Sequence, residues 1–231
     1  VVPESAHAAS YISPTISELA ASIEADGDGA VDAFWKRCES EGTPLVEAIP
    51  EEDSYVWVTF VWRGDERTEN VVLQGGVAGG ATHRRIMSRL GESNVWFKTI
   101  RYRNDLRGSY GFSVNDPLIP LSAAERDALP NPPQRMNDPF AANKRGEESF
   151  VELEEASIQV WAEFDRDTPR GKTKAIREFE SKILNNVRQL TVYTPHDYAA
   201  DQGPYPVVLI FDRMSYSTSV PTRVILDNLI A

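Results

Sequence analysis

The first part of the chain has apolar side chains at the spacing of a helix. They recur every three or four positions, as at Phe34, Trp35 and Cys38. Residues at that spacing share one helix face, so the pattern predicts two short amphipathic helices, over about 15–25 and 30–40.

Beyond residue 42 the period shortens to that of an extended chain. Four segments are rich in β-branched and aromatic residues and have turn residues between them: 55–62, 70–73, 95–102 and 108–114. Strands that follow one another without helices between them predict an antiparallel β-sandwich. The N-terminal part of the chain is therefore expected to be mainly β.

Proline interrupts the pattern between residues 115 and 147. Because proline has no backbone N–H and a fixed φ, it ends regular elements. The stretch predicts a long surface connection, with one helical turn near 123–128. A domain boundary is expected in such a connection.

The last part of the chain predicts the opening of an α/β unit. Strands are predicted over 149–153, 175–181, 187–194 and 207–211. The last of these is purely apolar, which is typical of a strand covered on both faces, as in a parallel sheet. A helix is predicted over 218–230, with Pro221 in its first turn.

Charge and composition narrow the function classes. A net charge of −11 over 231 residues argues against nucleic-acid binding and against docking on anionic lipid. A local arginine cluster can still bind an anionic ligand. The single cysteine, Cys38, excludes an intrachain disulfide and a cysteine-based zinc site. No apolar run reaches the length of a membrane span, and no signal peptide is visible in the sequence as printed.

Three groups of motifs stand in a fixed order along the chain. The first group is 34–35, 42–47 and 58–64, the second is 94–99, 105–110 and 115–117, and the third is 188–195, Tyr198 and 205–212. In this order and spacing, over about residues 30–231, they resemble the enterochelin (ferric enterobactin) esterase family. The alternative is a non-catalytic immunoglobulin-like module of a larger enzyme, which binds a glycan or a protein.

The resemblance implies a fold and a division into domains. After a flexible arm over 1–14, it implies an immunoglobulin-like (early-set) β-sandwich with short N-terminal helices and the Pro-rich connection over 15–147. The first strands and helix of an α/β-hydrolase domain follow over 148–231.

The resemblance also implies a substrate and a location. It implies cytoplasmic hydrolysis of the trilactone of ferric enterobactin or a related catecholate siderophore, which weakens the iron cage. Iron enters with this substrate, so no cofactor and no metal held by the protein are expected. The expected partners are the siderophore and either a homo-oligomer or a segment that completes the hydrolase.

Ester hydrolysis of this kind needs an activated serine, a histidine base and an orienting carboxylate. In α/β-hydrolases the serine stands in a Gly-x-Ser-x-Gly turn between a strand and a helix. The sequence lacks this motif, because Gly108-Ser109-Tyr110-Gly111 has a different spacing and lies in a predicted strand. The three histidines are isolated and complete neither a triad nor a metal motif. We expect this chain by itself to be inactive, with the nucleophile beyond residue 231.

One piece of an esterase site is implied near residue 212. In α/β-hydrolases the loop after the third strand donates a backbone amide to the oxyanion hole. The resemblance places that loop here, so Arg213 and Met214 are candidate backbone donors and Tyr216 is a candidate substrate contact. The alternative is an ordinary strand–helix connection, since Arg213 stands where relatives tend to have Gly.

Arginine clusters supply the other candidates. A ferric tris-catecholate is anionic and carries flat rings, and guanidinium groups bind such a ligand through charge and stacking. Arg84 and Arg85, near a Gly-rich loop, and Arg107 are the candidate substrate contacts. For Arg107 the alternative is a buried ion pair with Asp105 or Asp116.

Overall fold

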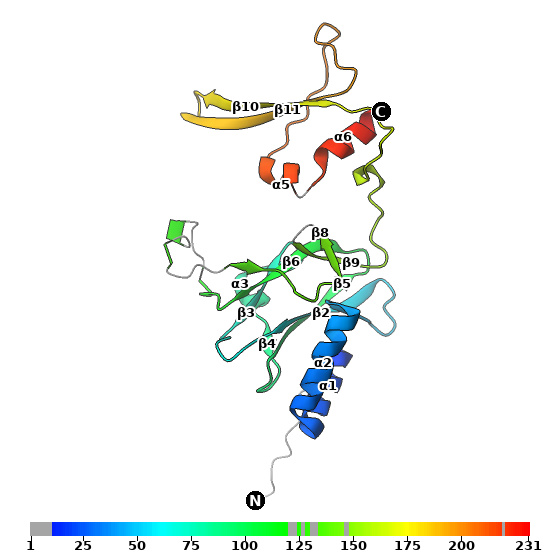
Figure 1. Ribbon diagram of the computed structural model, residues 1–231, viewed down its shortest axis with the longest axis vertical. Coiled ribbons are helices and arrows are strands. Elements are labelled where there is room, and N and C mark those ends of the chain that lie inside the picture. The colour runs from blue at the N-terminus through cyan, green and yellow to red at the C-terminus, as the bar shows by residue number, and fades with distance from the viewer. Residues whose placement is uncertain (1–10, 120–123, 126–127, 130–133, 146–147, 219) are drawn as a thin grey trace, which may run out of the picture. The chain divides into compact units, whose positions relative to one another are not determined.

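The computed structural model describes residues 11–119, 124–125, 128–129, 134–145, 148–218 and 220–231 (Figure 1). The chain divides into two compact units, one ending at Ser157 and the other beginning at Ile158. Each unit is described by itself. The predicted arm and the predicted turn near 123–128 fall largely outside the described residues.

The N-terminal unit begins with two helices, as predicted. Helix α1, Pro14–Asp26, follows Ser13, whose Oγ accepts a hydrogen bond from the Ile16 N–H at 3.2 Å. Such a side-chain acceptor satisfies one of the free amides of a first helical turn. Helix α2, Asp28–Glu41, comes next and has a buried apolar face. Burial raises the pKa of the Cys38 thiol on this face to about 12, so the thiol stays protonated.

Two antiparallel sheets follow the helices. The first has the strand order β1-β2-β5-β4, with bounds Leu45–Ala48, Tyr55–Arg63, Val95–Arg103 and Ser88–Arg89. The second has the order β3-β6-β9-β8, with bounds Val71–Gly75, Arg107–Val114, Glu148–Glu152 and Asn143–Arg145, and β7, Arg135–Met136, also pairs with β6. Helix α3, Thr82–Arg85, lies between β3 and β4 in the chain. The predicted class, mainly β with short helices, is confirmed.

Strand β2 shows how the unit is layered, because side chains alternate between the two faces of a strand. Phe60 lies in a core that includes Leu73 and Phe112 of the second sheet. Its neighbour Val61 lies in a separate cluster with Trp35 of α2. The first sheet is therefore the middle layer, with the second sheet on one face and the helices on the other.

Strand β9 belongs to the N-terminal unit. The sequence placed the boundary after residue 147, which assigned this strand to the second domain. In the structure β9 pairs with β6 and β8, and Val151 and Leu153 are buried in the core between the sheets. The compact division therefore falls after Ser157.

The C-terminal unit contains a hairpin and two short helices. Strands β10, Lys172–Ser181, and β11, Asn186–Thr194, pair antiparallel and confirm the two strands predicted there. A single 3₁₀ turn, η1, Val160–Ala162, precedes the hairpin. Helices α5, Arg213–Thr218, and α6, Thr222–Ile230, follow it (orange and red in Figure 1). Across the described part of both units, no helix has the length and apolar content needed to cross a membrane.

The strand predicted over 207–211 is absent from this unit. These residues are exposed, Val207 to 89% and Phe211 to 75%. A purely apolar strand is stable when neighbours cover it on both sides. Among the described residues after Ser157, the only sheet is the pair β10-β11, and it does not include this run.

The helix predicted over 218–230 begins only at Thr222, as α6, and the separate helix α5 ends at Thr218. Pro221 precedes α6 as its N-cap and does not lie in its first turn. Proline has no backbone N–H and disfavours helical geometry in the residue before it, so the helix begins only after this point.

Candidate functional site

The candidate residues belong to different units. The N-terminal unit contains the arginines Arg84, Arg85 and Arg107, and the C-terminal unit contains Arg213, Met214 and Tyr216. Each group has its own structural surroundings.

Arg107 opens strand β6 and forms an ion pair with β9. Its Nη2 donates to Glu152 Oε1, and its side chain is only 17% exposed. The acidic partner is therefore Glu152, and neither Asp105 nor Asp116, because Asp105 pairs instead with Arg103 at 2.7 Å. Nε and Nη1 of Arg107 are buried and have no hydrogen-bond partner among the described residues. Two of the three nitrogens of this guanidinium are therefore unpaired in the described part of the chain.

Arg84 and Arg85 lie in helix α3. Arg84 is exposed, whereas Arg85 is half-buried. Nη2 of Arg85 donates to Thr82 Oγ1 at 3.4 Å, and its Nε is buried without a partner in the described part of the chain. The loop before the helix begins at Gly75, whose φ is 102°; a Cβ there would lie 2.4 Å from the Ser109 carbonyl oxygen. Only glycine allows this close approach.

The candidate oxyanion donors follow a sharp turn at Asp212. This residue has a φ of 55°, a left-handed conformation that Asp adopts more readily than most residues. Its carbonyl accepts the Tyr216 N–H at 3.2 Å. The side chain of Arg213 reaches β11, where its Nη2 donates to Gln189 Oε1 at 3.1 Å. Met214 is exposed. The segment is therefore turned at Asp212 and attached to β11 beyond it.

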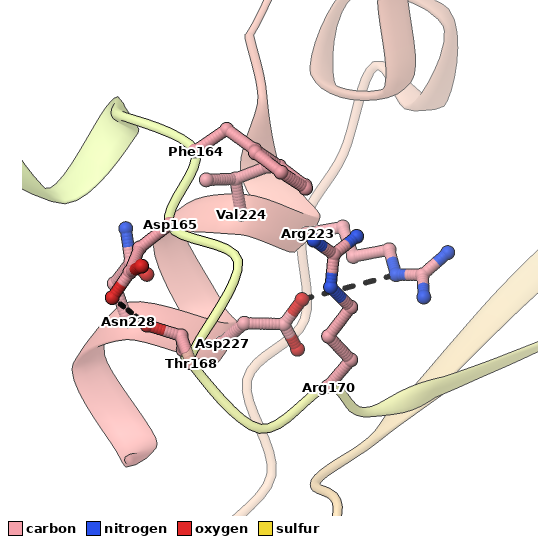
Figure 2. A pocket seen from close by; sticks show the side chains of 8 residues that line it. All are labelled: Phe164, Asp165, Thr168, Arg170, Arg223, Val224, Asp227 and Asn228. Carbon is pink, nitrogen blue, oxygen red and sulfur yellow. Dashed lines mark hydrogen bonds and ion pairs between the residues drawn. The ribbon is translucent and has the colours of Figure 1, made fainter.

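A small open pocket of about 170 Å³ lies beside α6 (Figure 2). Its walls are the loop before β10 and α6 itself: Phe164, Asp165, Thr168, Arg170, Arg223, Val224, Asp227 and Asn228. Arg170 lies over the ring of Phe164, with 4.0 Å between guanidinium carbon and ring centroid. Hydrogen bonds from the Asp167 N–H and the Thr168 hydroxyl hold the pKa of Asp165 below its usual range. Two arginines balance two aspartates, so charge alone does not make the pocket an anion site.

Asp227 is the buried charge of this pocket. Among the residues after Ser157 whose burial the structure describes, only Gly171 and Asp227 are buried. Oδ1 of Asp227 accepts the Gly171 N–H at 2.7 Å and the Tyr193 hydroxyl at 2.8 Å. Oδ2 lies 3.9 Å from Arg223 Nε, and Figure 2 shows the carboxylate facing that arginine. We call Gly171, Tyr193, Arg223 and Asp227 the Asp227 clasp.

Glycine is required at position 171 for the clasp to close. A Cβ there would lie 2.4 Å from the Thr194 carbonyl oxygen and 2.5 Å from the Tyr193 ring. Arg223 Nη2 also donates to the Gly171 carbonyl at 3.3 Å, so both polar backbone atoms of this residue bond to α6. Burial, with the hydrogen bond to Asp227, raises the pKa of Tyr193 to about 12, so its hydroxyl stays a donor.

Helix α6 holds a third segment through Asn228. Its Nδ2 donates to the carbonyls of Trp161 and Glu163 at 2.9 and 2.8 Å. The helix thus binds η1, the start of β10 and the end of β11. Sequence analysis missed this arrangement. The one signal available was Asp227-Asn228 inside an otherwise apolar helical run.

The N-terminal unit has its own buried carboxylate, Asp138. Its Oδ2 accepts the Tyr110 hydroxyl at 2.9 Å and Thr43 Oγ1 at 2.7 Å, and its Oδ1 accepts the Phe140 N–H at 2.9 Å. Burial raises the pKa of Asp138, against the lowering effect of these bonds. The network fastens the chain near Phe140 to β6 and to Thr43, so its role is structural. In the part of the chain that the structure describes, no three His, Cys, Asp or Glu side chains are grouped to hold a metal ion.

Comparison with known proteins shows which proteins this chain resembles. Residues 57–162 match the family described as the N-terminal domain of enterochelin esterase. An iron(III) enterobactin esterase of Yersinia enterocolitica is 29% identical over 242 aligned residues, which cover 88% of this chain and 65% of that protein. An iron(III) enterobactin esterase of Dickeya dadantii is 25% identical over 236 residues, or 89% of this chain and 52% of that protein. The chain thus spans between half and two thirds of the length of these relatives.

The fold is similar to that of a solved esterase. The crystal structure of a ferric enterobactin esterase from Salmonella typhimurium aligns with a TM-score of 0.53 and 19% identity, over 86% of this chain and 54% of that one. At this identity the similarity concerns the fold, and it agrees with a mainly β chain that carries short helices. From these matches together, the chain is similar to the enterochelin (enterobactin) esterases, and its residues 57–162 match their N-terminal domain.

Proposed function

We propose that this chain is part of a siderophore esterase, which hydrolyses the trilactone of ferric enterobactin or of a related catecholate. The observation that carries the proposal is the similarity, over 88% of the chain, to the iron(III) enterobactin esterase of Yersinia enterocolitica. Cleavage of the ester backbone separates the catecholate arms and so weakens the hold on iron. The reaction is assigned to the cytoplasm.

The finer description of the fold is part of this proposal. The two-sheet unit is taken as an immunoglobulin-like sandwich, and the residues after Ser157 as the opening of an α/β-hydrolase domain. Antiparallel sheets around one core support the first assignment. The exposed apolar run 207–211 supports the second, because a contiguous apolar surface of this kind is usually covered by another segment.

The proposed chemistry needs a donor for the charge that develops on the ester carbonyl oxygen. A serine hydroxyl, activated by histidine and a carboxylate, attacks the carbonyl, and preorganised N–H groups stabilise the resulting oxyanion. The backbone amides of Arg213 and Met214 are assigned this role, and the turn at Asp212 orients them. A Gly-x-Ser-x-Gly nucleophile is missing from the sequence, so the chain by itself is proposed to be inactive.

Arginines and a tyrosine are assigned to the substrate. Buried nitrogens of Arg85 and Arg107 lack hydrogen-bond partners among the described residues, so these groups retain donors for catecholate oxygens. Arg84 and Tyr216 are exposed and are assigned as further contacts. Iron arrives inside the siderophore, so the proposal includes no resident cofactor. The proposed partner besides the siderophore is a second copy or a segment that completes the hydrolase.

A hydrolysis assay tests this function. Iron-loaded enterobactin is incubated with the 231-residue chain and, separately, with the full-length gene product. Linear dihydroxybenzoyl-serine products are then followed by chromatography. Products are expected with the full-length protein and not with the 231-residue chain. If the full-length protein gives no product, the esterase proposal fails and a non-catalytic binding module replaces it. Turnover by the pure 231-residue chain would contradict the assigned inactivity.

A further inference from the structure

We propose that Asp227 is a positioning residue of the esterase, which acts through Tyr193 to fix the segment 212–218 against the hairpin. This inference rests on the function proposed above, because it concerns the segment to which the oxyanion donors are assigned. It adds a role for the Asp227 clasp, whose residues do not take part in the proposed chemistry.

The argument begins with two contacts on one strand. Arg213 of α5 bonds to Gln189, and Asp227 of α6 bonds to Tyr193. Both partners belong to β11, and residues four apart on a strand point to the same face, here about 13 Å apart at about 3.3 Å per residue. The α5–α6 run is therefore attached to β11 at two points along one face.

Hydrogen bonds join the described residues between these two points. The Val220 N–H donates to the Ser215 carbonyl at 3.0 Å, which joins α5 to the residues just before α6. The Ile225 N–H donates to the Pro221 carbonyl at 3.0 Å and closes the first turn of α6. A displacement of α6 is therefore transmitted to α5 and to the turn at Asp212.

The two attachments differ in strength because they differ in burial. Arg213 and Gln189 are exposed, so water competes for their hydrogen bond. Asp227 is 7% exposed, and its Oδ1 accepts two hydrogen bonds, one of them from the buried Gly171. A hydrogen bond to a buried charge is costly to lose, because the remaining group stays unpaired. Asp227 therefore determines the position of α5 and α6 relative to β11.

Position matters for this segment because oxyanion donors act over short distances. They must lie within hydrogen-bond reach of the place where the charge develops. A displacement of about 1 Å can cost on the order of 100-fold in rate. Because this charge exists only in the transition state, misplaced donors lower kcat and leave KM nearly unchanged.

The experiment uses four variants of the full-length gene product. Tyr193→Phe removes one hydroxyl and keeps the ring. Asp227→Ala removes the acceptor, whereas Asp227→Asn keeps Oδ1, which accepts both hydrogen bonds. Tyr205→Phe is the matched control, since the Tyr205 hydroxyl bonds locally, to the backbone of Ala199.

The kinetic outcome separates positioning from stability. Turnover of iron-loaded enterobactin is measured per active serine, counted by stoichiometric labelling with a fluorophosphonate. We expect kcat to fall about 10- to 100-fold in Tyr193→Phe and Asp227→Ala, with KM within about twofold. Asp227→Asn should recover most of the loss, and Tyr205→Phe should match the wild type. A loss that appears in KM, or that disappears when turnover is counted per labelled serine, overturns the proposal.

A second readout does not require activity. Hydrogen–deuterium exchange of the amides of residues 213–218 should be about tenfold faster in Tyr193→Phe than in the wild type, the change expected for one lost hydrogen bond to a charged acceptor. Tyr205→Phe should leave that exchange unchanged. Equal exchange in Tyr193→Phe and the wild type refutes the positioning role, whether or not the protein hydrolyses enterobactin. Absence of hydrolysis by the wild type, with the exchange difference present, refutes the esterase and leaves the clasp as a support of this segment.

Discussion

At the scale of single residues, the two buried carboxylates differ in the groups that face them. Asp138 is faced by neutral donors, the hydroxyls of Tyr110 and Thr43 and one backbone amide. Asp227 has a guanidinium, that of Arg223, at 3.9 Å. The desolvation of Asp138 outweighs its hydrogen bonds and the charge of Lys144, so its pKa rises. Its protonation should therefore be visible in stability.

The first prediction concerns the pH dependence of stability at Asp138. A carboxyl whose pKa is higher in the folded protein stabilises fully below its unfolded pKa of about 4, and this contribution is lost as the pH rises through the folded pKa. The free energy of unfolding of the wild type should therefore decline above pH 4 more steeply than that of Asp138→Asn. Urea unfolding between pH 4 and 8 measures both slopes. Parallel curves would mean that Asp138 has an ordinary pKa in the folded protein.

The second prediction concerns the glycine of the clasp. In Gly171→Ala the added Cβ meets a carbonyl oxygen and a ring at 2.4 and 2.5 Å, and such overpacking costs about 1 to 3 kcal/mol. Exchange of the β10–β11 amides should accelerate accordingly. The control is Gly76→Ala, since a Cβ at Gly76 has no atom within 4 Å. Equal exchange in the two variants would show that the hairpin accommodates the added Cβ without a loss of stability.

Neither carboxylate was predicted from the sequence as a bonding centre. Tyr110 and Asp138 are 28 residues apart, and Gly171 and Asp227 are 56 apart. Local patterns carry no information on which distant hydroxyl or amide faces a carboxylate. Arg107 shows the same limit. The sequence pointed to an acidic partner nearby in the chain, whereas the partner is Glu152, on a neighbouring strand.

At the scale of elements, sequence periodicity predicts the helices and strands that depend on the spacing of apolar residues close together in the chain. The helices α1 and α2 and the long strands β2, β5, β6, β10 and β11 were all predicted, because their apolar spacing is local. The run 207–211 was assigned wrongly, since a strand exists only where a partner strand pairs with it. Pro221 was placed inside a helix, whereas it precedes α6 as its N-cap. Short edge strands such as β4 and β7, each two residues long, leave too little pattern to detect.

The third prediction uses the two faces of the first sheet. Val61 is fully buried between β2 and the helices, so Val61→Ala should lower the free energy of unfolding by about 1 to 3 kcal/mol, through lost burial and the cavity left behind. Val46, on the edge strand β1, is 51% exposed. Val46→Ala should therefore change stability by less than about 0.5 kcal/mol. Equal losses, measured by urea unfolding, would contradict the helix-covered face of β2.

At the scale of the whole molecule, the two units differ in how they are held together. The N-terminal unit has two apolar cores. In the described part of the C-terminal unit the buried residues are Gly171 and Asp227, which bond to each other, while many of its large apolar side chains are exposed and the others are only half-buried. Apolar burial is the main favourable term in folding. The second unit of this chain should therefore open more easily than the first.

The fourth prediction tests this difference by limited proteolysis of the 231-residue chain. Chymotrypsin should cut first after exposed aromatic residues of the C-terminal unit, among them Trp161, Phe164, Phe179 and Phe211. The buried aromatic residues of the N-terminal unit, such as Trp35 and Phe60, should be protected. Mass spectrometry of the early fragments identifies the sites. An early cut before residue 157 would show that the N-terminal unit is not the more stable one.

The uncovered run 207–211 has a consequence for self-association. Five consecutive Val, Leu, Ile and Phe residues without a charge form the type of segment that stacks into cross-β fibrils. Pro206 and Asp212 stand directly on either side of it. Proline cannot donate to a growing ladder, and like charges in stacked copies repel, so both residues act as gatekeepers. Replacing either one should shorten the lag before thioflavin-positive aggregates form.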